Sequence, residues 1–190
     1  RPRNLDDYIG QSHLVGEGAI LRQMIESGNL SSFILWGPPG VGKTSLARII
    51  ANVLERPFFT LSAVTSGVKD VRDVIDKAKR HAAANNGLFG AQQEGEDRRA
   101  VLFIDEIHRF SKSQQDSLLG AVEDGTITLI GATTENPSFE VITPLLSRCQ
   151  VYVLKPLAKD DLLHLLNRVM KEDEYIRSLN VEIKETESIL

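Results

Sequence analysis

The chain has 190 residues, which is long enough to bury one sizeable hydrophobic core. Hydrophobic residues make up 42% and charged residues 25%, values typical of globular proteins, which excludes a disordered or fibrous class. The net charge of −4 argues against a protein that coats nucleic acid without selectivity, because such proteins carry a strongly basic surface.

The sequence also bears on cellular location. No apolar run approaches the length of a membrane span, and the first residues lack the apolar stretch of a secretory signal. We therefore expect no membrane partner and an intracellular protein. A eukaryotic source, which an insertion at 82–99 favours, implies the nucleus, and a bacterial source implies the cytoplasm or nucleoid. The single cysteine, Cys149, excludes an internal disulfide framework, and we interpret it as a small buried apolar residue.

In chain order, five short apolar runs predict β-strands, and apolar residues at helical spacing follow several of them. The predicted strands are 33–36, 58–61, 101–104, 127–132 and 151–154, and the predicted helices are 43–54, 69–84 and 112–122. Strands that alternate with helices favour a parallel sheet covered on both faces. We therefore predict an α/β domain over residues 1–156, with a five-stranded parallel sheet flanked by helices.

Two stretches depart from this alternation. Residues 82–99 begin with alanines and continue with Asn, Gly, Gln and mixed charge, which predicts a helix end followed by a surface insertion. After Pro156, apolar residues at helical spacing over 160–170 predict the start of a second, small helical unit, residues 157–190. The last part of that unit is polar and contains no obvious closing element.

The strongest motif is Gly37-Pro38-Pro39-Gly40-Val41-Gly42-Lys43-Thr44, which fits G-x-x-x-x-G-K-[ST] between a predicted strand and a predicted helix. Its glycines let backbone N–H groups converge on phosphate oxygens, and the dipole of the following helix adds positive potential. Lys43 would reach the β- and γ-phosphates of ATP, and the Thr44 hydroxyl would ligate Mg²⁺. The alternative, a glycine-rich turn with an exposed lysine, does not account for the flanking strand and helix. We expect nucleotide contacts from Pro38, Pro39, Gly40, Val41, Gly42, Lys43, Thr44 and Ser45.

The second motif is an apolar run that ends in Asp105 and Glu106. At the carboxyl end of a central strand, Asp105 would hold Mg²⁺ directly or through water, and Glu106 would orient or deprotonate the attacking water. An acidic pair of this kind can also be no more than a capped turn. Its occurrence together with the phosphate-binding motif favours the catalytic interpretation.

Four segments together resemble the clamp-loader clade of AAA+ ATPases, which are P-loop NTPases. Within that clade the sequence is most similar to the RarA/MgsA family, which includes the Werner helicase-interacting ATPases. The resemblance covers residues 1 to about 156 and implies a helical lid after the sheet domain. It rests on the phosphate loop, Asp105-Glu106-Ile107-His108-Arg109-Phe110, Gly131-Ala132-Thr133-Thr134-Glu135-Asn136-Pro137 and Ser147-Arg148-Cys149.

The resemblance implies roles for individual residues. Tyr8 and Ile9 would lie near adenine, although they can equally anchor an N-terminal arm. Thr133 matches the residue that senses the γ-phosphate, with a strand-capping turn threonine as its alternative. Arg148 matches an arginine that acts in trans, in the ATP site of a neighbouring subunit. Ser62 stands where clamp loaders often carry an asparagine that restrains the catalytic glutamate, a departure that puts such a switch in doubt.

By the same resemblance, the protein is expected to be a DNA-stimulated, Mg-dependent ATPase in replication-fork maintenance, repair and recombination. It would act as a homo-oligomer with replication and repair proteins, and Lys69 and Arg72 suit a DNA backbone. One alternative is a nucleotide-switched scaffold with slow hydrolysis, and another is a different clamp-loader-like or branch-migration AAA+ ATPase. A protein unfoldase is disfavoured because residues 62–69 contain no aromatic side chain. The family's Gly-Asp-Ala-Arg type lid motif does not occur in this sequence.

Overall fold

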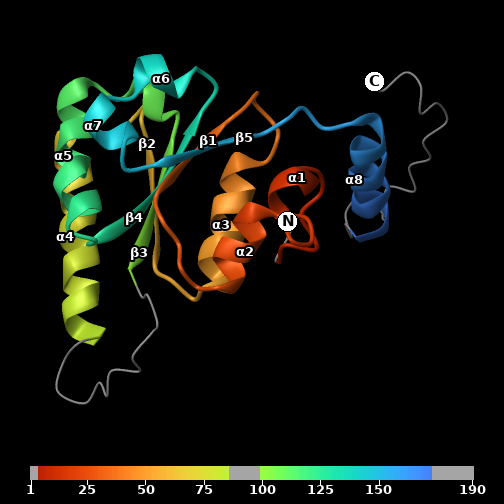
Figure 1. Cartoon of the computed structure of the whole chain (residues 1–190), viewed down its shortest axis with the longest axis horizontal. Helices are drawn as coiled ribbons and strands as arrows, with labels where there is room; N and C mark the ends of the chain where they lie inside the picture. The colour runs from red at the N-terminus through yellow and green to blue at the C-terminus, as the bar shows by residue number, and fades with distance from the viewer. Residues whose placement is uncertain (1–3, 86–98, 173–190) are drawn as a thin grey trace.

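The computed structural model describes residues 4–85 and 99–172. Its centre is a five-stranded, fully parallel sheet with the strand order β2-β3-β4-β1-β5 (Figure 1). Because all strands run the same way, their carboxyl ends share one edge of the sheet and their amino ends share the other. The strands are β1 (Phe33–Trp36), β2 (Phe58–Ser62), β3 (Ala100–Asp105), β4 (Ile127–Thr133) and β5 (Gln150–Val153).

Helices cover both faces of the sheet, which makes a three-layer α/β/α arrangement (Figure 1). One face packs against α1 (Ser12–Val15), α2 (Ile20–Glu26) and α3 (Lys43–Val53). The other face packs against α4 (Val68–Asn85), α5 (Lys112–Glu123) and α7 (Thr143–Leu146). The remaining elements are the 3-10 turn η1 (Ile107–Arg109), α6 (Pro137–Glu140) and α8 (Lys159–Glu172).

The pleat of the strands divides the core into two layers. Phe33 and Leu35 of β1 pack toward α3, whereas Ile34 between them packs toward α4 and α5, and all three are fully buried. Successive side chains of a strand point to opposite faces, so a strand buried on both faces reads as a continuous apolar run. Burial of each such side chain contributes roughly 1.5–3 kcal/mol.

The predicted fold class is confirmed. All five predicted strands are present with ends within two residues of the prediction, and the predicted helices at 43–54, 69–84 and 112–122 correspond to α3, α4 and α5. The proposed insertion at 82–99 begins as the end of α4, and residues 86–98 lie outside the described residues. Cys149 is half-buried against the second core layer, and this burial raises the pKa of its thiol to about 12.

The start of the second helical unit is α8, which stands beyond α1 at the end of an extended linker (Figure 1). The N-terminal arm, residues 4–11, connects it to the sheet domain. Gln11 makes two hydrogen bonds to the backbone of Lys155 in the linker, at 2.7 and 2.9 Å. Arg168 of α8 donates to the carbonyl oxygen of Asp7 at 2.7 Å. The division at residues 156 and 157 stays a prediction, and residues 173–190 lie outside the described part of the chain.

None of the helices in the described part of the chain is both long enough and apolar enough to span a bilayer.

Candidate functional site

The phosphate-binding motif forms the turn between β1 and α3, as its sequence predicts. Gly40 and Gly42 adopt left-handed φ angles of 79° and 94°, which residues with a Cβ atom rarely adopt. At Gly37 the constraint is space, because a Cβ there would lie 2.7 Å from the carbonyl oxygen of Leu154. These glycines let the loop turn tightly into the N-terminus of α3, where helix N–H groups point outward.

Lys43 is buried at the start of α3, with its ammonium directed back into the loop. Its Nζ donates to the carbonyl oxygens of Gly37 and Pro38 at 2.7 and 2.8 Å. Burial lowers the pKa of Lys43, and the nearby carboxylates of Asp105 and Glu106 partly offset that effect. A phosphate in the loop would compete with the two carbonyls for this ammonium.

Two oxygen donors suited to Mg²⁺ flank Lys43. Thr44 is exposed in the first turn of α3, and Asp105 is half-buried at the carboxyl end of β3. Among the described residues no group of three or more His, Cys, Asp or Glu side chains could hold a metal ion. Mg²⁺ held with a nucleotide takes one or two protein ligands and completes its shell with phosphates and water.

Glu106 follows β3 in an unusual backbone conformation. Its φ of 56° lies in the left-handed region, which costs a residue other than glycine about 1–3 kcal/mol. This turn ends the strand and starts η1, in which the N–H of Arg109 donates to the carbonyl oxygen of Glu106 at 2.8 Å. The Glu106 side chain is 34% exposed, so a water molecule can reach it.

A histidine connects Glu106 to Thr133. His108 Nε2 lies 3.2 Å from Oε2 of Glu106, and its Nδ1 lies 3.0 Å from Oγ1 of Thr133. The backbone of Thr133 in turn accepts a hydrogen bond from the N–H of Gly37 at 3.1 Å. The phosphate loop, the carboxylate pair and the end of β4 are therefore joined at one edge of the sheet.

The two proposed adenine contacts, Tyr8 and Ile9, differ in how deeply they are buried. Tyr8 is buried, its hydroxyl donates to the carbonyl oxygen of Val41 at 3.1 Å, and a Cβ on Gly42 would lie 2.9 Å from that hydroxyl. Burial raises the pKa of Tyr8, so the phenol is neutral. Ile9 is half-buried. These contacts agree with an anchor for the N-terminal arm, and adenine binding at Tyr8 and Ile9 stays a prediction.

Arg148 lies at the opposite edge of the sheet. It precedes β5, whose first residue, Gln150, pairs with Phe33 at the start of β1, whereas the phosphate loop follows the end of β1. The Arg148 guanidinium forms an ion pair with Glu123 at the end of α5 and donates to the carbonyl oxygen of Pro144 at 2.7 Å. The structure therefore does not bring Arg148 to the phosphate loop of its own chain.

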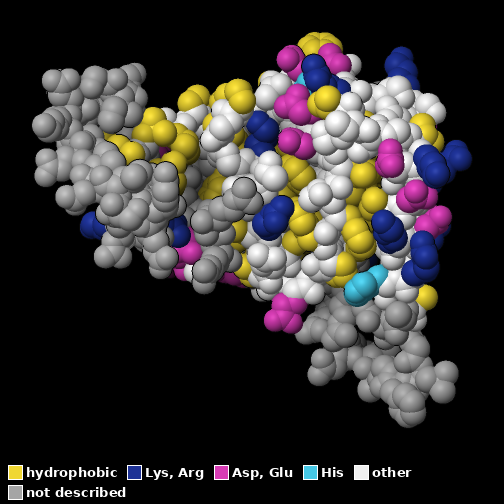
Figure 2. Space-filling model, turned by 180° about the vertical axis from the view of Figure 1, so that it is seen from behind, with side chains coloured by type: hydrophobic (Ala, Val, Ile, Leu, Met, Phe, Trp, Pro, Cys, Tyr) yellow, Lys and Arg dark blue, Asp and Glu magenta, His cyan; other side chains and the backbone are white. Residues whose placement is uncertain are grey.

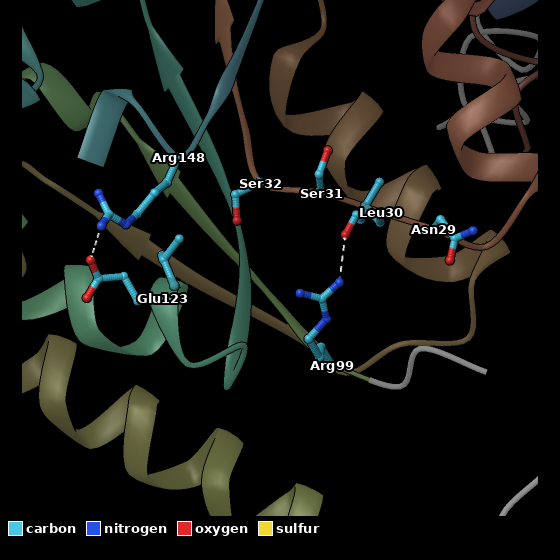
Figure 3. A pocket seen from close by; sticks show the side chains of 8 residues that line it. Asn29, Leu30, Ser31, Ser32, Arg99, Glu123 and Arg148 are labelled. Carbon is cyan, nitrogen blue, oxygen red and sulfur yellow. Dashed lines mark hydrogen bonds and ion pairs between the residues drawn. The ribbon is translucent and has the colours of Figure 1, made fainter. Parts of the chain in front are cut away.

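An open cavity of about 630 Å³ lies beside this ion pair (Figure 3). Arg148 and Arg99 enter it from different elements, and Arg99 donates to the carbonyl oxygen of Leu30 at 3.2 Å. The lining is mainly polar and comes from the amino edge of the sheet: Asn29, Leu30, Ser31, Ser32, Arg99, Val122, Glu123 and Arg148.

The proposed DNA contacts, Lys69 and Arg72, are exposed near the start of α4. Acidic residues share that exposed surface, and Figure 2 shows dark blue and magenta side chains interspersed on the side that carries α4 and α5. A groove between the two helices likewise combines Arg72 and Lys79 with Asp76 and Asp124. The DNA role of Lys69 and Arg72 stays a prediction.

Sequence reasoning assigned no role to two residues that organise this region. His108 belongs to the motif at 105–110 but has no predicted role of its own. A histidine two positions after a candidate base is nevertheless a sequence signal for a residue that contacts that base. Gln115 is buried on α5, where its amide bonds the carbonyl oxygens of Phe110 and Glu140 and the N–H of Ile142 at 2.8–3.1 Å. A lone glutamine in an amphipathic helix carries no comparable sequence signal.

Comparison with known proteins gives one family match. Residues 33–157 match the family described as "ATPase family associated with various cellular activities (AAA)". This range covers the sheet from β1 to β5 and includes Lys43, Asp105, Glu106, Thr133 and Arg148.

Named relatives and solved structures agree with that match. The chain is 51% identical over 172 residues to "Replication-associated recombination protein A" of Escherichia coli K12 and 49% identical over 171 residues to "ATPase WRNIP1" of Dictyostelium discoideum. Each alignment covers 90% of this chain, but 36% of the first relative and 18% of the second. The structure "Thermotoga maritima RuvB Holliday junction branch migration motor" aligns with a TM-score of 0.68 at 30% identity, over 97% of this chain and 56% of that one.

Proposed function

Because the chain belongs to the AAA family of ATPases, we propose that it binds and hydrolyses Mg-ATP at the carboxyl edge of its sheet. The observation that carries the proposal is the meeting of three motifs at that edge. The phosphate loop follows β1, Asp105 and Glu106 follow β3, and Thr133 ends β4. A hydrogen bond from Gly37 to Thr133 and the contacts of His108 with Glu106 and Thr133 join them.

Each side chain then has a distinct task. Lys43 neutralises charge on the β- and γ-phosphates, while Thr44 and Asp105 hold Mg²⁺. Glu106 takes a proton from the attacking water, and Thr133 contacts the γ-phosphate and helps to fix that water. Asp105 and Glu106 differ in role because a bound Mg²⁺ would neutralise the charge of Asp105, whereas Glu106 would stay basic. Adenine lies near Tyr8 and Ile9 in this proposal.

Arg148 completes the site of a neighbouring subunit. A planar guanidinium stabilises the charge that spreads over the transferring phosphoryl group. Arg148 is at the opposite sheet edge from the phosphate loop of its own chain, which supports action in trans. A homo-oligomer follows, in which the amino edge of one subunit faces the carboxyl edge of the next.

The biological setting is proposed from the relatives, since the chain spans 36% of the first of them. We place the protein in replication-fork maintenance, repair and recombination, as a DNA-stimulated ATPase that binds DNA through Lys69 and Arg72. Relatives named for replication-associated recombination support this setting. Replication and repair proteins are the expected partners.

The test is ATP turnover of the full-length protein, with single-stranded, duplex and forked DNA in parallel at a stated salt concentration. We expect forked or single-stranded DNA to raise turnover, and Lys43→Ala to abolish both tight ATP binding and turnover. A rate that no DNA changes would remove DNA stimulation from the proposal. Tight ATP binding with negligible turnover under all conditions would favour a nucleotide-switched scaffold.

A second candidate is a branch-migration ATPase, which the similarity to the RuvB motor favours. Turnover on a four-way junction, compared with a fork of equal length, separates the two candidates. Preferential stimulation by the junction would favour branch migration.

A further inference from the structure

His108 is held in place by the packing of η1 on β4. Ile107 is fully buried, and its side chain lies so close to Gly131 that a Cβ there would be 3.2 Å from Cδ1 of Ile107. The missing side chain of Gly131 lets η1 approach β4, and this approach brings the next residue, His108, beside Thr133 at the end of the strand. Only 12% of the His108 side chain is exposed, so its ring has little freedom.

The neighbours of the ring favour one imidazole tautomer. Nε2 lies 3.2 Å from a carboxylate oxygen of Glu106, which can only accept while ionised, so the tautomer that suits this contact carries its proton on Nε2. In a neutral ring of this tautomer Nδ1 is an acceptor, and the hydroxyl of Thr133 can donate to it. The imidazole thus links a hydroxyl on one side to a carboxylate on the other.

The hydroxyl of Thr133 has one proton to give. It accepts from the N–H of Glu135 at 3.0 Å, and its own proton can point to Nδ1 of His108 or to the carbonyl oxygen of Glu135, 3.1 Å away. A γ-phosphate at Thr133 would be a third acceptor for the same proton. Whatever binds Thr133 therefore changes the contact that fixes His108, and through it the contact that fixes Glu106.

We propose that His108 is a positioning residue that links the nucleotide contact at Thr133 to the orientation of Glu106. By holding Oε2, the ring leaves Oε1 to face the attacking water. This inference rests on the proposed roles of Glu106 and Thr133 and adds the connection between them. In this proposal His108 acts through Glu106 and Thr133.

The test is a set of His108 variants in the full-length protein. His108→Phe keeps the ring volume and loses both contacts, His108→Gln can place an amide N–H toward Glu106, and His108→Asn reaches only toward Thr133. We expect His108→Phe to lower kcat by about 10- to 100-fold, the usual loss when a side chain that orients a functional group is removed. Its ATP dissociation constant should stay at the wild-type value. His108→Gln should recover part of the rate, and His108→Asn should not.

A double variant separates this inference from the function it rests on. If Glu106 acts only while His108 holds it, adding His108→Phe to Glu106→Gln should cause no further loss of kcat. A full additional loss would overturn the inference, as would a wild-type kcat for His108→Phe. If Glu106→Gln itself hydrolyses ATP normally, the proposed base fails instead. Should His108→Phe not fold, equal rates for the Gln and Asn variants would overturn the positioning role.

Discussion

The two edges of the sheet hold the side chains of the proposed site in different ways. At the carboxyl edge Lys43 is 8% and Thr133 0% exposed, and both are bonded within their own subunit. At the amino edge Arg148 and Glu123 are 39% and 43% exposed beside an open cavity. Buried, hydrogen-bonded groups are pre-organised for chemistry, whereas an exposed ion pair can be exchanged at small cost. The carboxyl edge is therefore suited to form the ATP site of its own subunit. The amino edge is suited to complete the ATP site of a neighbouring subunit.

The largest expected effect is at the amino edge. Arg148→Ala should lower ATP turnover by roughly 10³- to 10⁵-fold, the usual contribution of an arginine finger, while ATP binding stays normal. Mixing Arg148→Ala subunits with Lys43→Ala subunits should restore turnover. At some interfaces the intact ATP site of an Arg148→Ala subunit then receives the intact Arg148 of a Lys43→Ala subunit. Turnover of mixtures at fixed total protein measures this rescue.

Arg148→Lys is the matched variant, since it keeps the charge but loses the planar guanidinium, and it should stay well below wild type. Mixed oligomers that form but never recover turnover would show that Arg148 does not act in trans. Full activity of Arg148→Ala alone would have the same meaning.

The second effect is at the carboxyl edge. Glu106→Gln keeps the size and polarity of the side chain but removes its basicity, so hydrolysis should fall by roughly 10²- to 10⁴-fold. ATP affinity should persist, and single-turnover rates together with equilibrium binding measure the two properties separately. Unlike Arg148→Ala, this variant should not be rescued by Lys43→Ala subunits, because no subunit then has both a phosphate loop and a base. Parallel losses of binding and hydrolysis would assign Glu106 a structural role.

A smaller effect is expected where the two edges are joined. Gln115 connects Phe110, which ends η1, to Ile142, which precedes α7 and the chain leading to Arg148. Gln115→Ala would leave two carbonyls and one N–H without this partner, which should lower the free energy of unfolding by about 1–3 kcal/mol. Thermal or denaturant unfolding measures it.

Asp116→Ala, an exposed neighbour on the same helix, is the control and should change stability little. If Gln115→Ala has the same free energy of unfolding as wild type, water replaces the hydrogen bonds of the Gln115 amide. The connection that Gln115 makes between the two edges of the sheet would then be weak.

The carboxyl edge was largely predictable from sequence because its signals are local. The run at 33–36 matches β1 because a strand buried on both faces must be continuously apolar. The phosphate loop is recognisable because its glycines, lysine and threonine lie within eight residues. The sequence therefore predicts that Lys43, Asp105 and Glu106 belong to one site.

What the sequence did not predict depends on contacts through space. The His108 bridge exists because Gly131 lets η1 approach β4, and those residues are far apart in the chain. The pairing of Arg148 with Glu123 likewise depends on how α7 packs beside α5. Helices α1, α6 and α7 have four residues each, too few for a helical period to emerge.

The smallest expected effect concerns the exposed ion pair between Glu123 and Arg148, which we expect to restrain Arg148 within its own subunit. Glu123→Gln removes the charge that holds Arg148 within its own subunit, so Arg148 should reach a neighbour more readily. An exposed pair contributes at most about 1 kcal/mol, so turnover at low protein concentration should rise by no more than roughly fivefold. The difference from wild type should shrink as salt is added, because screening weakens the pair in the unsubstituted protein.

Asp116→Asn is the matched control for Glu123→Gln, because it removes a carboxylate from the same helix two turns before the pair. It should leave turnover at the wild-type level. A fall in turnover for Glu123→Gln would mean that Glu123 orients Arg148 for the neighbouring site and does not restrain it. The amino edge would then be pre-organised like the carboxyl edge, and the contrast between the two edges would be one of exposure alone.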